Sequence, residues 1–119
     1  DVFIVGHWDA IINISEKIRE DFGQFTSLNK DMGISGGIVV VRPKFPIAES
    51  ADMAKKEEDK AKRDKKDKIS VFLTPVKWDV LRDQMEFSEY LTRQLHEKKY
   101  GRRFLHSLSQ IARYSLCNL

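Results

Sequence analysis

The order of hydrophobic and polar residues predicts three strands alternating with two helices, followed by helices only. Short apolar runs at 2–5, 33–41 and 69–73 are rich in β-branched residues and end at Gly, Pro or Thr, which is typical of strands. Between them, apolar residues recur at helical spacing in 11–25, and small residues line one face of 47–61. This order predicts an α+β fold with a helical tail.

Local signals refine the boundaries of these elements. Asp9 is placed to cap the first helix, and Pro46 suits the first turn of the second. Gly36 and Gly37 lie side by side in the second strand. Glycine in a strand marks a bulge or a position where another group approaches the backbone closely.

The last third of the chain has the spacing of helices. Apolar residues at helical intervals predict one helix from Trp78 to Leu95, with a break near Glu86, and another from Phe104 to Leu116. The segment 98–101 between them is typical of a turn.

The predicted sheet is incomplete, because three strands and two helices make only part of a domain of this kind. We therefore expect the chain to be a piece of a larger domain. The strand at 2–5 would have an unpaired edge, and such edges pair readily with another chain. We expect the isolated piece to dimerise or to exchange strands.

Composition limits the class of protein. The 119 residues suffice for one compact domain, with 41% hydrophobic and 33% charged residues. No apolar run approaches the roughly 20 residues needed to cross a bilayer, and Cys117 is the single cysteine. These features predict a cytoplasmic protein without a membrane partner. The net charge is +3, and most residues at 55–68 are charged; a solvated helix end is favoured there over contact with phosphate or RNA.

Several runs together resemble one family, the Csm-type large subunits of type III CRISPR effector complexes. The run at 1–9, DVFIVGHWD, is similar to the family segment that begins at the last aspartate of the GGDD motif. The matching order continues through ISGGI at 34–38, RPKFPI at 42–47, the helix ending in Ala-Lys at 54–62, ISVF at 69–72 and the Trp-Asp pair at 78–79. The tail from Tyr90 resembles the start of a helical domain.

The resemblance implies a partial ferredoxin-like palm, related to polymerases and nucleotidyl cyclases. It places the C-terminal part of a GGDD palm at 1–76 and the start of a helical C-terminal domain at 77–119. The implied activity of the parent enzyme is the linking of ATP into cyclic oligoadenylates, with Mg²⁺ or Mn²⁺ as the cofactor. The implied partners are the other subunits of the effector complex, guide RNA and target RNA.

The resemblance also implies roles for five residues. Asp1 matches the last aspartate of GGDD, a catalytic metal ligand, and Ser35 matches a serine that hydrogen-bonds adenine. Lys62 matches a lysine that contacts the triphosphate in related cyclases, and Gly36 and Gly37 would leave room for the nucleotide. The alternatives from the residues themselves are an exposed terminal aspartate, an ordinary strand serine and a solvated lysine.

Departures from the family pattern leave other interpretations open. The chain lacks the first three residues of GGDD and an adjacent His-Asp pair, and its three histidines are isolated, so we expect the fragment to be inactive alone and the histidines to lie at the surface or pack. One alternative is a diguanylate cyclase of the GGDEF type, although Asp1 is followed here by Val2 and not by glutamate. Others are a non-catalytic module that binds RNA or protein, and a purely structural piece.

Overall fold

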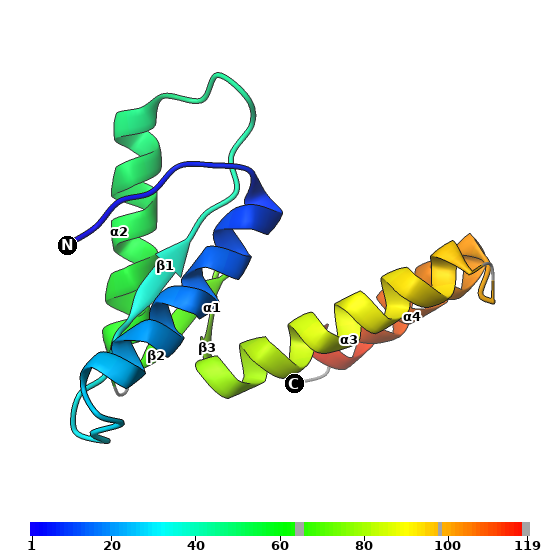
Figure 1. Cartoon of the computed structure of the whole chain (residues 1–119). Coiled ribbons are helices and arrows are strands. Elements are labelled where there is room, and N and C mark those ends of the chain that lie inside the picture. Colours follow the sequence, from blue (N-terminus) through cyan, green and yellow to red (C-terminus); the bar gives the residue numbers. More distant parts are fainter. Residues whose placement is uncertain (64–65, 98, 118–119) are drawn as a thin grey trace. The chain divides into compact units, whose positions relative to one another are not determined.

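The computed structural model describes residues 1–63, 66–97 and 99–117, with the backbone alone at 115–117 (Figure 1). The chain divides into two compact units, Asp1–Arg82 and Asp83–Leu119. The first contains a three-stranded sheet and two helices, and the second is helical. The predicted α+β class with C-terminal helices is confirmed.

The sheet of the first unit has the order β1–β2–β3. Strand β1 (Gly36–Ile38) runs parallel to β2 (Lys68–Val71), with Gly37 opposite Ser70. Strand β3 (Thr74–Lys77) is antiparallel to β2 and forms one edge. A connection through a helix joins the two parallel strands, as such pairs require.

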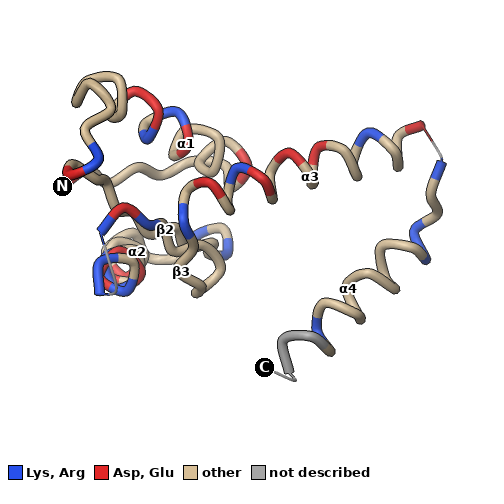
Figure 2. Tube along the Cα trace, turned by 90° about the horizontal axis from the view of Figure 1, so that it is seen from below, with Lys and Arg blue, Asp and Glu red and all other residues tan. Residues whose placement is uncertain are grey.

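Two helices cover the sheet. Helix α1 (Trp8–Phe25) and helix α2 (Ile47–Arg63) lie on opposite sides of it (Figures 1 and 2). Alternate strand residues face the two helices, because successive side chains of a strand point to opposite faces. The apolar side chains buried in this unit are Ile12, Ile38, Ala61, Ile69, Val71, Trp78 and Leu81.

The strand predictions were only partly correct. Residues 1–7 have no regular secondary structure, and Val2 is 87% exposed, so the predicted strand at 2–5 is wrong. None of the strands in the described residues pairs with this run. Strand β1 covers three of the nine residues predicted, because only 36–38 have partners in β2.

The hairpin between β2 and β3 was missed. Its turn residues, Phe72 and Leu73, have φ of 51° and 67°, in the left-handed region that two-residue hairpin turns require. Asn or Gly usually marks such a turn, and neither is present. Pro75 looks like a stop signal, but an edge strand accepts proline.

The helix predictions were closer. His7, not Asp9, is the N-cap of α1, and Asp9 lies in the first turn, where its carboxylate accepts a hydrogen bond from Ala10 N at 2.7 Å. Helix α2 begins directly after Pro46. Ser50 Oγ donates to the Pro46 carbonyl at 3.0 Å, which ties the proline to the first turn.

The second unit is built from helix. Helix α3 (Trp78–His96) starts in the first unit and is continuous, so the break predicted near Glu86 is wrong. Helix α4 (Arg102–Cys117) follows. Between them residues 99 and 100 form a bend, whereas residue 98 of the predicted turn lies outside the described residues. No helix in the described ranges is long and apolar enough to cross a bilayer.

Candidate functional site

A row of alternating charges runs from Asp1 along one face of α2. Lys55 Nζ lies 3.3 Å from Asp1 Oδ2 and 2.9 Å from Glu58 Oε2. The other oxygen of Glu58 lies 2.5 Å from Lys62 Nζ. Spacings of three and four residues place Lys55, Glu58 and Lys62 on one helix face, and Figure 2 shows both signs of charge along α2. The structure therefore brings Asp1 and Lys62, two of the predicted site residues, to a common row.

The charges of this row stabilise one another. The pKa of the Glu58 carboxyl is lowered, mainly by its hydrogen bond from Lys62 and further by Lys55. The pKa of Lys55 is raised, mainly by Glu58. The side chains of Lys55 and Lys62 are 47% and 38% exposed, so another anion can reach both lysines from solution.

Lys55 is a site residue that the sequence analysis missed. It stands in a run of lysines and acids in which no single residue is distinctive. The available signal was its spacing of seven from Lys62, which places both lysines on the same face of a helix two turns apart.

The described residues do not by themselves form a divalent-metal site. Among them, no three His, Cys, Asp or Glu side chains cluster as metal ligands would. Asp1 forms an ion pair with Lys55. Because Mg²⁺ prefers six oxygen ligands, Asp1 can supply only part of a ligand set.

Ser35 lies at the start of β1 and belongs to a separate hydrogen-bond network. Its Oγ accepts a hydrogen bond from Asp67 N at 3.0 Å. The Asp67 carboxylate accepts from Ile34 N at 3.2 Å and from Arg19 Nη2 at 2.8 Å. Trp78 Nε1 donates to the Ile34 carbonyl at 2.9 Å. In the described part of the chain, no hydrogen bond or ion pair joins Ser35 to the row that starts at Asp1.

The two adjacent glycines have different surroundings. A Cβ at Gly37 would overlap Glu58 N and lie 2.6 Å from the Ala54 carbonyl, so the backbone of α2 packs directly on this residue. A Cβ at Gly36 would make ordinary contacts, at 3.8 Å and beyond, with the Ile69 side chain. Helix packing explains Gly37, and the role of the pair toward a nucleotide stays a prediction.

A buried carboxylate holds α2 on the sheet. Glu57 accepts a hydrogen bond from Ser70 Oγ of β2 at 2.5 Å, and Lys60 Nζ lies 2.5 Å from its other oxygen. These two hydrogen bonds, that of Lys60 first, lower the pKa of the Glu57 carboxyl against the opposing effect of burial. Glu57 thus anchors to the sheet the helix that carries Lys55 and Lys62.

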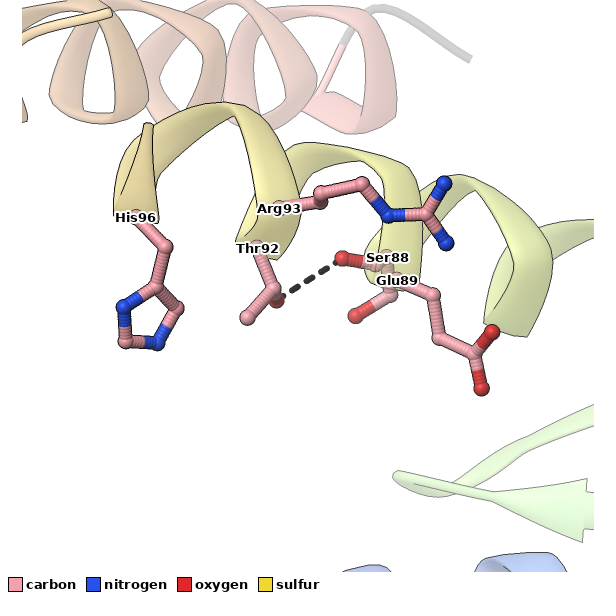
Figure 3. A pocket seen from close by; sticks show the side chains of 5 residues that line it. All are labelled: Ser88, Glu89, Thr92, Arg93 and His96. Carbon is pink, nitrogen blue, oxygen red and sulfur yellow. Dashed lines mark hydrogen bonds between the residues drawn. The ribbon is translucent and has the colours of Figure 1, made fainter. Parts of the chain in front are cut away.

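A shallow depression in the second unit lies along α3. Figure 3 shows its lining side chains, Ser88, Glu89, Thr92, Arg93 and His96. All five are exposed and come from one helix, and Thr92 Oγ1 donates to the Ser88 carbonyl at 2.9 Å. No second element encloses them, so this surface has the form of an ordinary helix face. All three histidines of the chain are exposed.

Comparison with known proteins gives a consistent picture. The family model described as Cas10/Cmr2, second palm domain, matches residues 1–70. The curated relatives include proteins named CRISPR system single-strand-specific deoxyribonuclease Cas10/Csm1 (subtype III-A). That of Methanocaldococcus jannaschii is 34% identical over 102 residues, covering 76% of this chain and 12% of the relative. That of Streptococcus thermophilus is 31% identical over 120 residues, covering 95% and 15%.

A third relative with the same name, from Enterococcus italicus, is 25% identical over 118 residues, covering 95% of this chain and 15% of the relative. No solved structure matches the chain. The chain thus spans 12–15% of the length of these relatives. The family match includes the runs at 1–9, 34–38 and 54–62, which contain the predicted site residues.

Proposed function

This chain belongs to the Cas10/Cmr2 second palm domain family, and from that premise we propose that it forms part of an ATP-binding site for cyclic oligoadenylate synthesis. The family match and the relatives confirm the resemblance to the large subunits of type III CRISPR complexes. The observation that carries the proposal is the row on α2, in which Lys55 pairs with both Asp1 and Glu58, and Glu58 pairs in turn with Lys62.

The row suits a triphosphate. Lys55 and Lys62 each pair with one oxygen of Glu58. Phosphate oxygens can replace those carboxylate oxygens, and a triphosphate carries more negative charge than one carboxylate. Lysine binds phosphate as a compact point charge. In the reaction, a 3′-hydroxyl attacks the α-phosphate of ATP, a phosphodiester forms and pyrophosphate leaves. The two lysines would offset the negative charge of the triphosphate.

The proposed cofactor is Mg²⁺ or Mn²⁺. Asp1 is a hard oxygen donor of the type that these cations prefer. It offers one carboxylate, and the remaining ligands must come from residues beyond those described. For this reason we expect the 119-residue chain alone to be inactive.

Ser35 is the proposed contact to the base. Its oxygen accepts from Asp67 N, so its hydroxyl proton can be donated to a ring nitrogen of adenine. A nucleotide would then be held at two places, by its base at the start of β1 and by its phosphates along α2. Helix α2 packs against β1, which fixes the two elements relative to each other.

The proposed setting is an effector complex in the cytoplasm. The relatives are named as members of a subtype III-A CRISPR system. By analogy, this chain would work with the other subunits of a type III complex and with guide and target RNA bound to them. Binding of target RNA would switch on synthesis.

The test compares this chain with a version extended to the length of the relatives. ATP and Mg²⁺ are titrated into both, calorimetry reports binding, and chromatography reports oligoadenylate. We expect only the extended version to bind ATP and make product, and Asp1→Ala to stop synthesis. Lys55→Ala and Lys62→Ala should each weaken ATP binding about 10-fold, as expected for the loss of one hydrogen bond to a charged group.

Lys56→Ala is the matched control, because Lys56 is an exposed neighbour of Lys55 outside the row. Equal losses for Lys55→Ala and Lys56→Ala would show that general charge, not the row, matters. If the extended version ignores ATP while either sample binds RNA with a steep dependence on salt, the chain is an RNA-binding module and the proposal is wrong.

A further inference from the structure

We propose that Asp67 and Arg19 are positioning residues that set the direction in which the Ser35 hydroxyl donates, and so determine the preference for adenine. This inference rests on the proposed role of Ser35 as the base contact. Neither residue belongs to the motifs on which the resemblance was based. Three segments distant in sequence, from α1, the start of β1 and the start of β2, meet in this network.

Asp67 takes part in the network through both its backbone N–H and its side-chain carboxylate. Its φ of 79° lies in the left-handed region, which aspartate tolerates better than most residues. That conformation accompanies the hydrogen bond from its N–H to Ser35 Oγ. Its carboxylate accepts from Ile34 N on one side and from Arg19 on the other. The contact to Ser35 is therefore braced from two directions.

Hydrogen bonding at Ser35 restricts the hydroxyl. A serine hydroxyl has one proton to donate and two lone pairs, and it rotates to suit its partners. In this network the oxygen is the acceptor, at 3.0 Å from Asp67 N. One lone pair is thereby directed at Asp67, and the proton must point elsewhere. Ser35 is half-buried, so the proton has few directions left, and a bound base can provide its acceptor.

The segment that carries Ser35 is also held without any ligand. A Cβ at Gly33 would lie 2.6 Å from the Asp67 Cβ, so only glycine allows this approach. Trp78 Nε1 fixes the Ile34 carbonyl, while Asp67 fixes the Ile34 N–H. A donor held in place before binding costs less ordering when the base arrives. The arrangement is that of a preorganised contact.

Arg19 keeps the carboxylate of Asp67 in this position. Its side chain is 25% exposed, and Nη2 lies 2.8 Å from Asp67 Oδ2. Its Nε is buried and has no hydrogen-bond partner among the described residues. An arginine placed in this way depends strongly on its one carboxylate, because partly buried charges are costly without a partner. Loss of either residue should release the other.

The experiment uses the chain extended to the length of its relatives and compares equilibrium binding of ATP and GTP. Ser35→Ala should weaken ATP binding about 3- to 10-fold, the range for one neutral hydrogen bond, and should reduce the preference for ATP over GTP. Asp67→Gly keeps the left-handed backbone and its N–H but removes the brace. Arg19→Gln removes the ion pair. Both should lose part of the same preference, about 2- to 5-fold.

Arg82→Gln is the matched control. Arg82 also pairs with a carboxylate across elements of the first unit, Glu16 of α1 at 3.0 Å, but it does not touch Ser35. The midpoint temperature of thermal unfolding should fall in Arg19→Gln and fall less in Arg82→Gln, because the Arg82 side chain is 50% exposed. The ATP to GTP ratio should change in Arg19→Gln alone. If Asp67→Gly does not fold, Arg19→Gln still carries the test.

Double variants that combine Ser35→Ala with Asp67→Gly or Arg19→Gln test whether these residues act through the Ser35 hydroxyl. If Asp67 and Arg19 act through the hydroxyl, their substitutions have no further effect on the ATP to GTP ratio in the Ser35→Ala background. An equal loss with and without Ser35 would overturn the inference and leave the proposed function intact. If Ser35→Ala itself leaves ATP binding unchanged while Lys55→Ala weakens it, the base contact is wrong and the inference with it. If the unsubstituted extended chain does not bind ATP, the proposed function fails.

Discussion

The two units of this chain use similar helices in different ways. Helices α1 and α4 both have apolar stripes. In the first unit one side of α1 faces the sheet and Ile12 is buried there, although Ile14, Ile18 and Phe25 remain exposed. In the second unit no side chain described in α4 is buried, and Phe104, Ile111 and Tyr114 are exposed. An apolar stripe predicts a helix, but the neighbouring elements decide whether the stripe is covered.

Side-chain size adds to the difference. The face of α2 toward β1 has Ala54 and the backbone of Glu57 and Glu58 against Gly37, so helix and strand touch backbone to backbone. The exposed face of α4 carries large side chains. The first unit therefore has a fixed core that can position a site, and substitutions in the two units should differ in their cost.

The largest expected effect is in the core of the first unit. Ile69→Ala should lower the free energy of unfolding by about 2–5 kcal/mol, because Ile69 is 1% exposed and its removal leaves a cavity in the middle strand. Urea unfolding of the 119-residue chain, followed by circular dichroism, measures this. A loss below about 1 kcal/mol would mean that the first unit lacks a packed core around its middle strand.

The next largest effect is a difference in stability between alanine substitutions at Gly37 and at Gly36. Gly37→Ala should cost about 1–3 kcal/mol or more, since the new methyl group meets the backbone of α2 and one element must move. Gly36→Ala is the matched control and should change stability little, because its Cβ makes ordinary contacts. The same urea titration applies to both. Equal costs would contradict the close packing of α2 on Gly37.

Much of this architecture could be predicted from the sequence. Four helices follow from spacing, and all appear close to their predicted bounds. The strand at 2–5 was wrong because apolar β-formers make a strand only beside a partner. Strand β3 was missed because Phe72 and Leu73 give no turn signal.

The candidate site was less accessible to sequence reasoning. Asp1 and Lys62 came from family motifs, and the structure places them in one row. Lys55 could have been found by helical spacing. The bracing of Ser35 by Asp67 could not, since it joins positions 32 residues apart through a backbone N–H. Such contacts depend on how β1 and β2 pair, which local patterns do not encode.

A smaller effect contrasts a buried with an exposed carboxylate. Because the native pKa of Glu57 is lowered, its stabilisation is complete above the unfolded-state value near 4.5 and is lost as pH falls through the native value. Glu57→Gln should cost about 1–2 kcal/mol at about pH 7 and a smaller amount at about pH 3. The free energy of unfolding should therefore fall less on acidification in the variant than in the parent.

Glu97→Gln is the control for that measurement. Glu97 pairs with Lys99 at 2.8 Å in the second unit, and both side chains are exposed. Surface pairs of this kind contribute roughly 0–1 kcal/mol, so this variant should follow the parent at both pH values. Identical behaviour of Glu57→Gln and Glu97→Gln would show that Glu57 does not hold α2 on the sheet.

The smallest effect is expected on α4. Ile111 is 62% exposed, and alanine is the better helix former, so Ile111→Ala should change the free energy of unfolding by no more than about 0.5 kcal/mol. The measurement is made at two protein concentrations about tenfold apart. A cost above about 1 kcal/mol that grows with concentration would mean that a second copy covers this face in solution, because only association makes stability depend on concentration. The two units would then differ in what packs on their helices, which is the sheet of the same chain for α1 and a second copy of the chain for α4.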